Sequence, residues 1–179
     1  MEDKVIKEWL DILYSVHYPR WNELPDFDLY MDQVLTLLER YLGFLQVENE
    51  RIITPNMINN YVKLKLIPKP KQKKYNKVHL AYLIAIMSLK QVLTISEIKA
   101  GILYQTNIVG LKSAYNGFCE MQELAIKETL GLMNYGYPKI IQDQIRDHTS
   151  IVITLSTRAF ASKIIASHIV TTRESNENE

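Results

Sequence analysis

The sequence predicts an all-α protein with a small helical domain followed by a further helical region. Apolar residues recur at three- and four-residue spacing along nearly the whole chain, which is the period of an amphipathic helix. Alternating β-branched runs are rare, and glycine accounts for only 6 of the 179 residues. Two segments also begin with residues that cap helices. We therefore expect five to eight helices, and the 47% hydrophobic content is enough to bury a core.

Two helices are predicted in the first third of the chain. The first spans residues 3–16, and its broad apolar face holds Val5, Ile6, Trp9, Leu10, Ile12 and Leu13. The second spans residues 28–45 with Asp28 as its N-cap, and its inward residues are Met31, Val34, Leu35, Leu38 and Leu42.

The next helix begins at Thr54 and Pro55. A threonine side chain accepts an unpaired backbone N–H, and proline at the first helical position has no N–H to leave unpaired. We expect this helix over residues 55–64. Pro68 and Pro70 stop further helix, so residues 66–76 are predicted to form a loop or short hairpin. A buried helix follows over residues 77–92, and Thr94 with Glu97 forms a capping box for the one after it.

The chain after Gly101 is predicted to be helical, with a break at residues 136–138, one or two helices over residues 139–170 and a disordered tail over residues 171–179. Two roles remain open for this region. A small effector would bind among aromatic and methionine side chains, which are more commonly core: Tyr104, Tyr115, Phe118, Met121, Met133 and Tyr135. A homodimer would pack through a seam of apolar and small residues: Ile141, Ile145, Val152, Leu155, Ala159, Ala166 and Ile169.

Charge is segregated along the chain although the formal net charge is only +1. Residues 1–50 hold four Lys or Arg against eleven Asp or Glu, residues 51–96 hold nine against none, and residues 97–179 hold eight against nine. A segment without carboxylates between acidic and neutral segments indicates an anion-binding face.

The carboxylate-free segment also carries side chains of the kind that can read DNA bases. Asparagine is unfavourable inside helices, yet the helix from Pro55 presents several on one face, and a carboxamide pairs bidentately with adenine in the major groove. Lysines in the following loop would contact phosphates as a wing. The predicted DNA-binding residues are Thr54, Asn56, Asn59, Asn60, Lys63, Lys69, Lys71, Lys73, Lys74, Tyr75 and Lys77. Two alternatives stay open: a merely solvated lysine loop, and a protein-interaction module whose basic loop docks an acidic partner, with the chain's own acidic N-terminal segment able to mask it.

Other classes of function lack their sequence signals. The four histidines show no metal-ligand spacing, and the single Cys119 lies in an apolar helical stripe. No Gly-rich phosphate loop, nucleophile elbow or paired acids are present, so we expect no enzyme and no cofactor. The longest apolar run, residues 80–89, is half the ~20 residues that a membrane helix needs. Lacking a leader and a disulfide pair, the chain is expected in the cytoplasm.

The stretch "ITPNMINNYVKLKLIPKPKQKKYNKVHLAYLIAIMSLKQVLTISEI" resembles the DNA-binding domain of MerR-type regulators at Tyr61, Leu66 to Pro68, Tyr75, Leu80, Leu83 and Ile98. "LYMDQV", "MINNYVK" and "KKY" resemble more closely the bacterial family called domain of unknown function 1836, whose members are described as MerR-like DNA-binding proteins. Lys65 occupies a place where MerR regulators usually have glycine, and the wing lacks the arginine usual after Tyr75.

The resemblance implies a winged helix-turn-helix over residues 24–103. The expected layout is an acidic N-terminal helix at 1–23, this domain, a dimerisation or effector region at 104–170 and the tail at 171–179. The function it implies is a transcription regulator that binds duplex DNA as a homodimer, with any small effector unknown.

Overall fold

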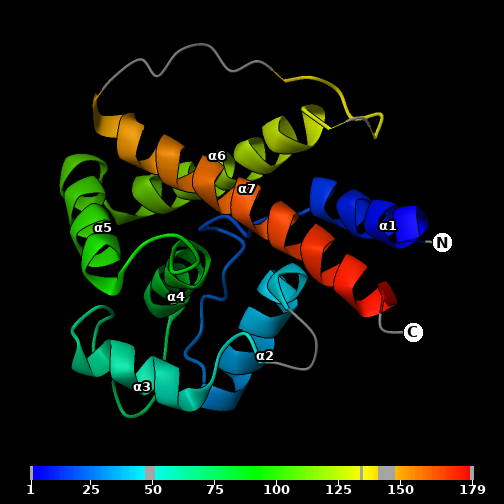
Figure 1. Ribbon diagram of the computed structural model, residues 1–179. Coiled ribbons are helices and arrows are strands. Elements are labelled where there is room, and N and C mark those ends of the chain that lie inside the picture. Colours follow the sequence, from blue (N-terminus) through cyan, green and yellow to red (C-terminus); the bar gives the residue numbers. More distant parts are fainter. Residues whose placement is uncertain (1, 47–50, 134, 141–147, 178–179) are drawn as a thin grey trace. The chain divides into compact units, whose positions relative to one another are not determined.

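The computed structural model describes residues 2–46, 51–133, 135–140 and 148–177. Seven α-helices make up this part of the chain, and it contains isolated bridges but no strand (Figure 1). They are α1 (Glu2–Tyr14), α2 (Met31–Leu42), α3 (Pro55–Lys63), α4 (Lys77–Leu89), α5 (Ile95–Val109), α6 (Leu111–Gly131) and α7 (His148–Glu177), with a 3₁₀ turn at Gly43–Leu45. The predicted all-α class is confirmed. None of the described helices combines the length and the apolar character needed to cross a bilayer.

The chain divides into two compact units, one formed by residues 18–119 and the other by residues 1–17 with 120–179. In the first, α4 is the central helix, with nine of its thirteen residues buried. Val34, Leu38 and Leu42 form the buried stripe of α2, which packs on α4. Their spacing of four residues keeps them on one face of the helix.

The ends of the 18–119 unit are joined to each other. The Tyr115 hydroxyl donates a hydrogen bond to the Pro19 carbonyl (2.7 Å), and the Trp21 amide donates to Asn116 Oδ1 (2.9 Å). The Tyr18 ring meets Phe118 edge-on, and its hydroxyl pairs with Ser88 Oγ (3.0 Å) inside the core. These contacts enlarge the unit beyond the 24–103 span that the sequence led us to expect.

Three of the helix starts can be compared with their predicted caps. Thr54 Oγ1 accepts the Met57 amide, and Thr94 and Glu97 form the predicted capping box, so both caps are confirmed. The predicted cap at Asp28 is wrong, because the helix begins after Tyr30, whose amide donates to the Gln33 side chain (2.8 Å). The backbone at Leu29 pairs instead with Tyr75 as an isolated antiparallel bridge, which holds the segment extended.

In the second unit, α1 packs against α7 through a narrower face than the sequence suggested. Ile6, Leu10 and Leu13 are fully buried, but Val5 and Ile12 are about half exposed. The difference arises because one neighbouring helix covers only one stripe of α1. Trp9 of α1 stacks on His168 of α7 with ring centroids 3.8 Å apart.

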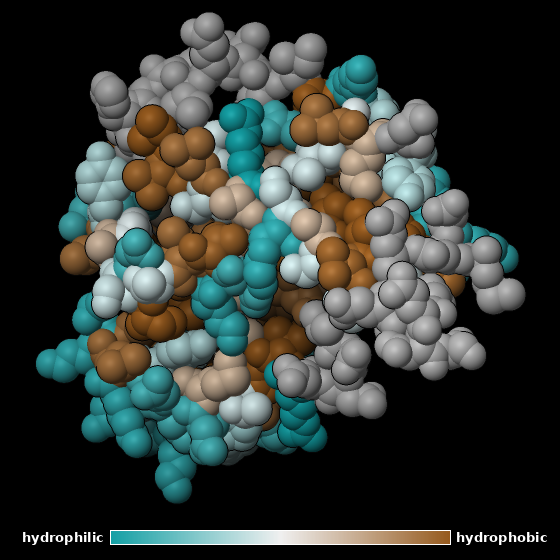
Figure 2. All heavy atoms as spheres, viewed as in Figure 1, coloured by the Kyte–Doolittle hydropathy of each residue, from teal (hydrophilic) through white to brown (hydrophobic). Residues whose placement is uncertain are grey.

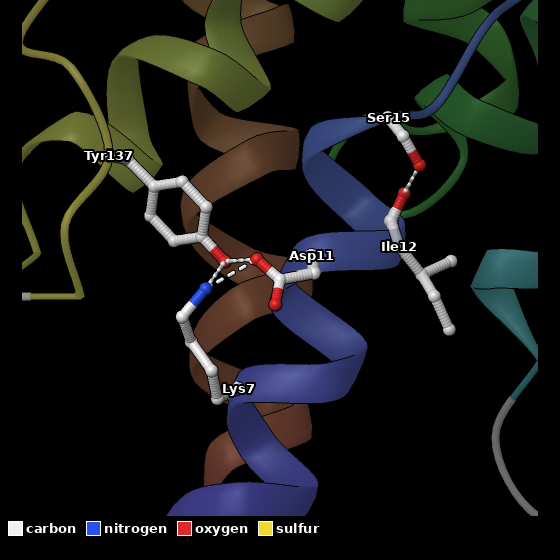
Figure 3. Close-up of polar contacts among 5 residues, drawn as sticks. All are labelled: Lys7, Asp11, Ile12, Ser15 and Tyr137. Atoms are coloured by element: carbon white, nitrogen blue, oxygen red, sulfur yellow. Dashed lines mark hydrogen bonds and ion pairs between the residues drawn. The ribbon is translucent and has the colours of Figure 1, made fainter.

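Figure 3 shows how α1 also holds the segment after α6. The Tyr137 hydroxyl donates to Asp11 Oδ1 (2.8 Å), and Lys7 contacts both side chains. The hydrogen bond and charge of Lys7 lower the pKa of Asp11, while burial and the Asp11 carboxylate raise the pKa of Tyr137. Tyr14 stacks on the same tyrosine ring. All five residues labelled in Figure 3 lie in this unit. The contacts of Tyr137 hold the segment after α6 against α1.

The last helix differs from the prediction at its C-terminal end. α7 continues to Glu177, so the predicted tail is helical up to that residue. Residues 171–177 contain neither glycine nor proline, and extending an existing helix is far easier than starting one. Ile141 and Ile145 of the predicted seam lie outside the described residues. Of the predicted pocket residues, Tyr115 and Phe118 are core and Tyr104 is half exposed.

Candidate nucleic-acid interface

Helix α3 separates its amide face cleanly from its apolar face. Asn56, Asn59, Asn60 and Lys63 are all exposed, whereas Ile58 and Tyr61 are buried at 0% and 5% exposure. None of the three asparagine side chains makes a hydrogen bond within the described part of the chain, so their amides stay available to a ligand. Figure 2 shows hydrophilic side chains gathering over α3, at the lower edge of the view.

The C-terminal end of α3 closes in a Schellman motif that places a lysine in a strained conformation. The Leu66 amide donates to the Tyr61 carbonyl (2.9 Å) and the Lys65 amide donates to the Val62 carbonyl (3.0 Å). Lys65 between them has φ of 54°, in the left-handed region that favours glycine. A conformation that glycine adopts most readily is thus held here by a lysine, whose exposed side chain adds charge at the end of α3.

The predicted loop or hairpin after α3 contains a tight hairpin turn. Lys71 and Lys74 form an isolated antiparallel bridge, with the Lys74 amide donating to the Lys71 carbonyl (2.9 Å). The two residues between them, Gln72 and Lys73, have φ of 50° and 60°. Positive φ at both central residues is the pattern of a type I′ turn. The turn residues Lys71, Gln72 and Lys73 are all exposed to solvent.

The base of this turn is anchored in the core. Leu29 and Tyr75 exchange backbone hydrogen bonds of 2.7 and 2.8 Å, and both side chains are buried. The Tyr75 ring meets His79 edge-on, and His79 accepts the Asn76 amide at the start of α4. Burial lowers the pKa of His79. The side chain of Tyr75 is therefore part of the anchor, and presents no surface to a ligand.

The predicted lysines fall into two groups. Lys63, Lys69, Lys71 and Lys73 are exposed and have no ion-pair partner within the described residues. Lys74 is partly covered and lies over the Tyr30 ring (5.3 Å). Lys77 is 21% exposed, pairs with Asp26 and lies 5.9 Å from the centroid of the Trp21 ring. The charges of the first group are available to a ligand. The charge of Lys77 is already neutralised by Asp26. The Thr54 hydroxyl already accepts the Met57 amide as the N-cap of α3.

Sequence reasoning missed three further cations around this surface. Lys65 lies at the end of α3, and Arg51 precedes its cap; both are exposed. Lys99 of α5 reaches across to the Leu64 carbonyl, with Nζ 3.2 Å from the oxygen. A cation at the C-terminal end of a helix also stabilises its dipole. The absence of acidic residues over 51–96 pointed to Arg51 and Lys65, but nothing in the sequence linked Lys99 to α3.

The arrangement offers hydrogen-bond donors, acceptors and positive charge, but no reactive group. Among the described residues, no cluster of three or more His, Cys, Asp or Glu side chains could hold a metal ion. Cys119 is fully buried and lies 3.7 Å from the Pro19 carbonyl. The chemistry that this surface supports is binding of an extended polyanion or of an acidic surface.

The sequence profile of the family described as Domain of unknown function (DUF1836) matches residues 19–118. Because the match covers more than half of the chain, the protein belongs to this family. The matched residues coincide with the compact unit of residues 18–119 to within one residue at each end. The comparison with curated proteins found no match, and neither did the comparison with solved structures.

Proposed function

We propose that this protein is a transcription regulator that binds duplex DNA through a MerR-like winged helix-turn-helix. In this proposal α3 is the recognition helix, the turn at residues 71–74 is the wing, and α2 is the scaffold helix. The protein acts as a homodimer on two half-sites. It needs no cofactor for binding.

The observation that carries the proposal is the exposed face of α3. Three asparagines in nine residues weaken the helix, and none of them makes a side-chain hydrogen bond to another described residue. A role outside the fold explains their presence, and base-edge recognition uses this side chain. The unpaired lysines of the following turn supply the phosphate contacts that fix a recognition helix on the duplex. The anchor at Leu29, Tyr75 and His79 gives that turn a rigid base.

The proposal is tested by measuring affinity for pooled genomic fragments by fluorescence anisotropy over a range of salt concentrations. Contacts with about four to six phosphates give a log–log slope of roughly −4 to −5. The triple variant Lys71→Glu, Lys73→Glu, Lys74→Glu should weaken binding to every fragment alike. The matched control is Lys4→Glu, Lys112→Glu, Lys139→Glu, which reverses three exposed lysines elsewhere. A flat salt dependence, or equal binding by the two triple variants, would refute the wing assignment.

One observation favours the second candidate, a protein-interaction module. Asp26 of the acidic N-terminal third already pairs with Lys77 at the base of the wing. The basic loop therefore accepts a carboxylate within its own chain, as it would from an acidic partner. The variant Asp26→Asn removes this ion pair and leaves Lys77 available to a ligand. Its affinity is then measured for random duplex DNA and for an acidic polypeptide such as poly-glutamate. Preference for poly-glutamate at equal charge density would favour the interaction module.

A further inference from the structure

The exposed face of α3 carries three amide side chains and a single cation. Asn56, Asn59 and Asn60 are exposed and make no hydrogen bond to another described residue. Lys63 is the charged residue of this helix, which contains no arginine. A carboxamide donates to adenine N7 and accepts from adenine N6, whereas arginine or lysine donates to guanine O6 and N7. The composition of this face therefore favours adenine over guanine.

The spacing of the three asparagines limits how far apart their bases can lie. A helix rises about 1.5 Å per residue, so Asn56 and Asn60 are about 6 Å apart along the axis, with Asn59 between them. Successive base pairs of a duplex are stacked about 3.4 Å apart. The three amides thus extend over less than two base steps. A helix that lies along the groove would present them to two or three consecutive base pairs.

An exposed leucine lies beside the amide face. Leu64 follows Asn60 by four residues and keeps a helical backbone as the C-cap (φ −74°, ψ −1°), so both side chains lie on one side of the helix. Leu64 is 46% exposed, although Tyr61 and Leu66 on either side of it are buried. The thymine of an A·T pair displays its C5 methyl group in the major groove, where apolar side chains contact it. Asn60 and Leu64 therefore complement the two halves of an A·T pair.

We propose that α3 recognises a run of two or three consecutive A·T base pairs. This inference rests on the proposed function, in which α3 is the recognition helix, and names the class of DNA sequence that it reads. The amides pair with adenine N6 and N7, and Leu64 packs on a thymine methyl group. The lysines of the turn at residues 71–74 contact phosphates and carry no sequence information. Sequence preference therefore arises on the amide face of α3.

The base preference is tested with three duplexes that share their flanks and differ in a central run of A·T, G·C or inosine·cytosine pairs. Inosine is guanine without the 2-amino group. An inosine·cytosine pair therefore has the minor-groove pattern of A·T and the purine O6 and N7 acceptors of G·C in the major groove. In competition anisotropy the full chain should bind the A·T duplex roughly five-fold or more tightly than the G·C duplex. The inosine duplex should bind as weakly as the G·C duplex.

The possible outcomes separate this inference from the proposed function. Equal affinity for the A·T and inosine duplexes would overturn the inference, because that result places the preference in the minor groove. Equal affinity for all three duplexes would overturn base recognition by α3 and leave DNA binding itself in place. Failure to bind any of the three duplexes at low salt would overturn the proposed function and this inference together.

A second experiment tests the asparagines atom by atom. In 7-deazaadenine a C–H group replaces N7, and the base pair and the minor groove are unchanged. This base should weaken binding by the wild type but not by the triple variant Asn56→Ala, Asn59→Ala, Asn60→Ala. The control Asn22→Ala, Asn107→Ala changes two exposed asparagines outside α3 and should respond as the wild type does. A triple variant with wild-type sensitivity to 7-deazaadenine would overturn the role of the asparagines. Because alanine favours the helix, its melting temperature should not fall.

The leucine contact is tested by replacing thymine with uracil, which removes only the C5 methyl group. Uracil should weaken binding by the wild type and have no effect on binding by Leu64→Ala, because the variant lacks the side chain that contacts the methyl group. Equal weakening in both proteins would overturn the Leu64 contact.

Discussion

Several residues next to α3 have a backbone conformation that is unfavourable for any residue except glycine. Lys65, Gln72 and Lys73 are the non-glycine residues with positive φ in the described chain, and all three lie between α3 and α4. Residues held in such conformations cluster at functional sites, because the surrounding structure must hold them there. Glycine would relieve the strain at each position but would remove the side chain. Two of the three are lysines, which fits a surface selected for charge.

Replacing Lys65 by glycine should stabilise the protein. The left-handed conformation costs a non-glycine residue roughly 1 to 2 kcal/mol, part of which glycine loses again through its greater freedom when unfolded. We expect a net gain of about 1 kcal/mol, or a melting temperature about 2 to 4 °C higher. Lys65→Ala is the control, because it removes the same charge but keeps the Cβ atom that causes the strain. Equal melting temperatures for the two variants would contradict this account, whereas DNA affinity should fall equally in both.

Replacing Asn59 or Asn60 by alanine should separate recognition from stability. Both side chains are exposed, and alanine is the better helix former, so the melting temperature should stay equal or rise slightly. If one of them pairs with a base edge, the ratio of cognate to random binding should fall by the equivalent of about 1 to 3 kcal/mol. Differential scanning fluorimetry and competition anisotropy measure the two quantities. A lower melting temperature with an unchanged ratio would show that the amide braces the protein instead.

Secondary elements near the interface follow from local sequence to different degrees. The Thr54 and Thr94 caps were predictable, because each depends on residues within four positions. The exposed asparagine face of α3 was predictable from the three- and four-residue spacing of its side chains. The cap at Tyr30 was not, because the extended segment before α2 depends on pairing with Tyr75, far away in sequence. The type I′ turn at Gln72 and Lys73 lacks the Asn-Gly signal of that turn, so only the two prolines and the lysines indicated a hairpin.

The element formed by the turn at residues 71–74 and the start of α4 should respond to pH through His79. Burial lowers the pKa of His79 below its ordinary value near 6.5, so between that value and the lower folded-state pKa the unfolded chain binds the extra proton. Stability should therefore fall as the pH drops through 6.5, by at most about 1.4 kcal/mol per pH unit for this group. The negative charge of Asp28 acts in the opposite direction and raises the pKa of His79, but burial has the larger effect.

The His79 effect can be isolated by substitution. His79→Gln retains an acceptor for the Asn76 amide, so its free energy of unfolding should depend less on pH between 7.5 and 5 than that of the wild type. His168, whose pKa burial also lowers, provides the comparison as His168→Gln in the other unit. Urea denaturation at each pH measures both. An identical pH profile for wild type and His79→Gln would mean that His79 does not lose its proton on folding.

At the scale of the whole molecule, the family match and the compact unit give the same boundaries, residues 19–118 and 18–119. The sequence led us to shorter limits because the contacts that close the unit, from Tyr115 to Pro19 and from Trp21 to Asn116, join residues nearly one hundred positions apart. Contacts between residues so far apart along the chain produce no periodic pattern in the sequence. Local features predicted which elements exist, but not how far the folding unit extends.

This correspondence predicts that residues 18–119 fold without the rest of the chain. The fragment keeps the α4 core and the hydrogen bonds that join its two ends, so it should unfold cooperatively and retain its helical circular dichroism. A fragment of residues 24–103 lacks those end contacts and should be markedly less stable. Equal stability of the two fragments would show that residues 18–23 and 104–119 do not belong to the folding unit.

The same fragment tests the roles that the proposed function gives to the two units. Residues 18–119 contain α3 and the wing, so the fragment should bind duplex DNA with the salt dependence of one copy. It lacks α7, so it should remain monomeric and lose the gain in affinity that comes from linking two copies of the proposed DNA-binding surface, commonly a factor of about 10² or more. The full-length Leu155→Glu variant should match the fragment, because both keep α3 and the turn at residues 71–74 and both lose the predicted dimer seam of α7. Binding by the fragment as tight as that of the full chain would mean that residues 120–179 serve a purpose other than pairing two copies on DNA.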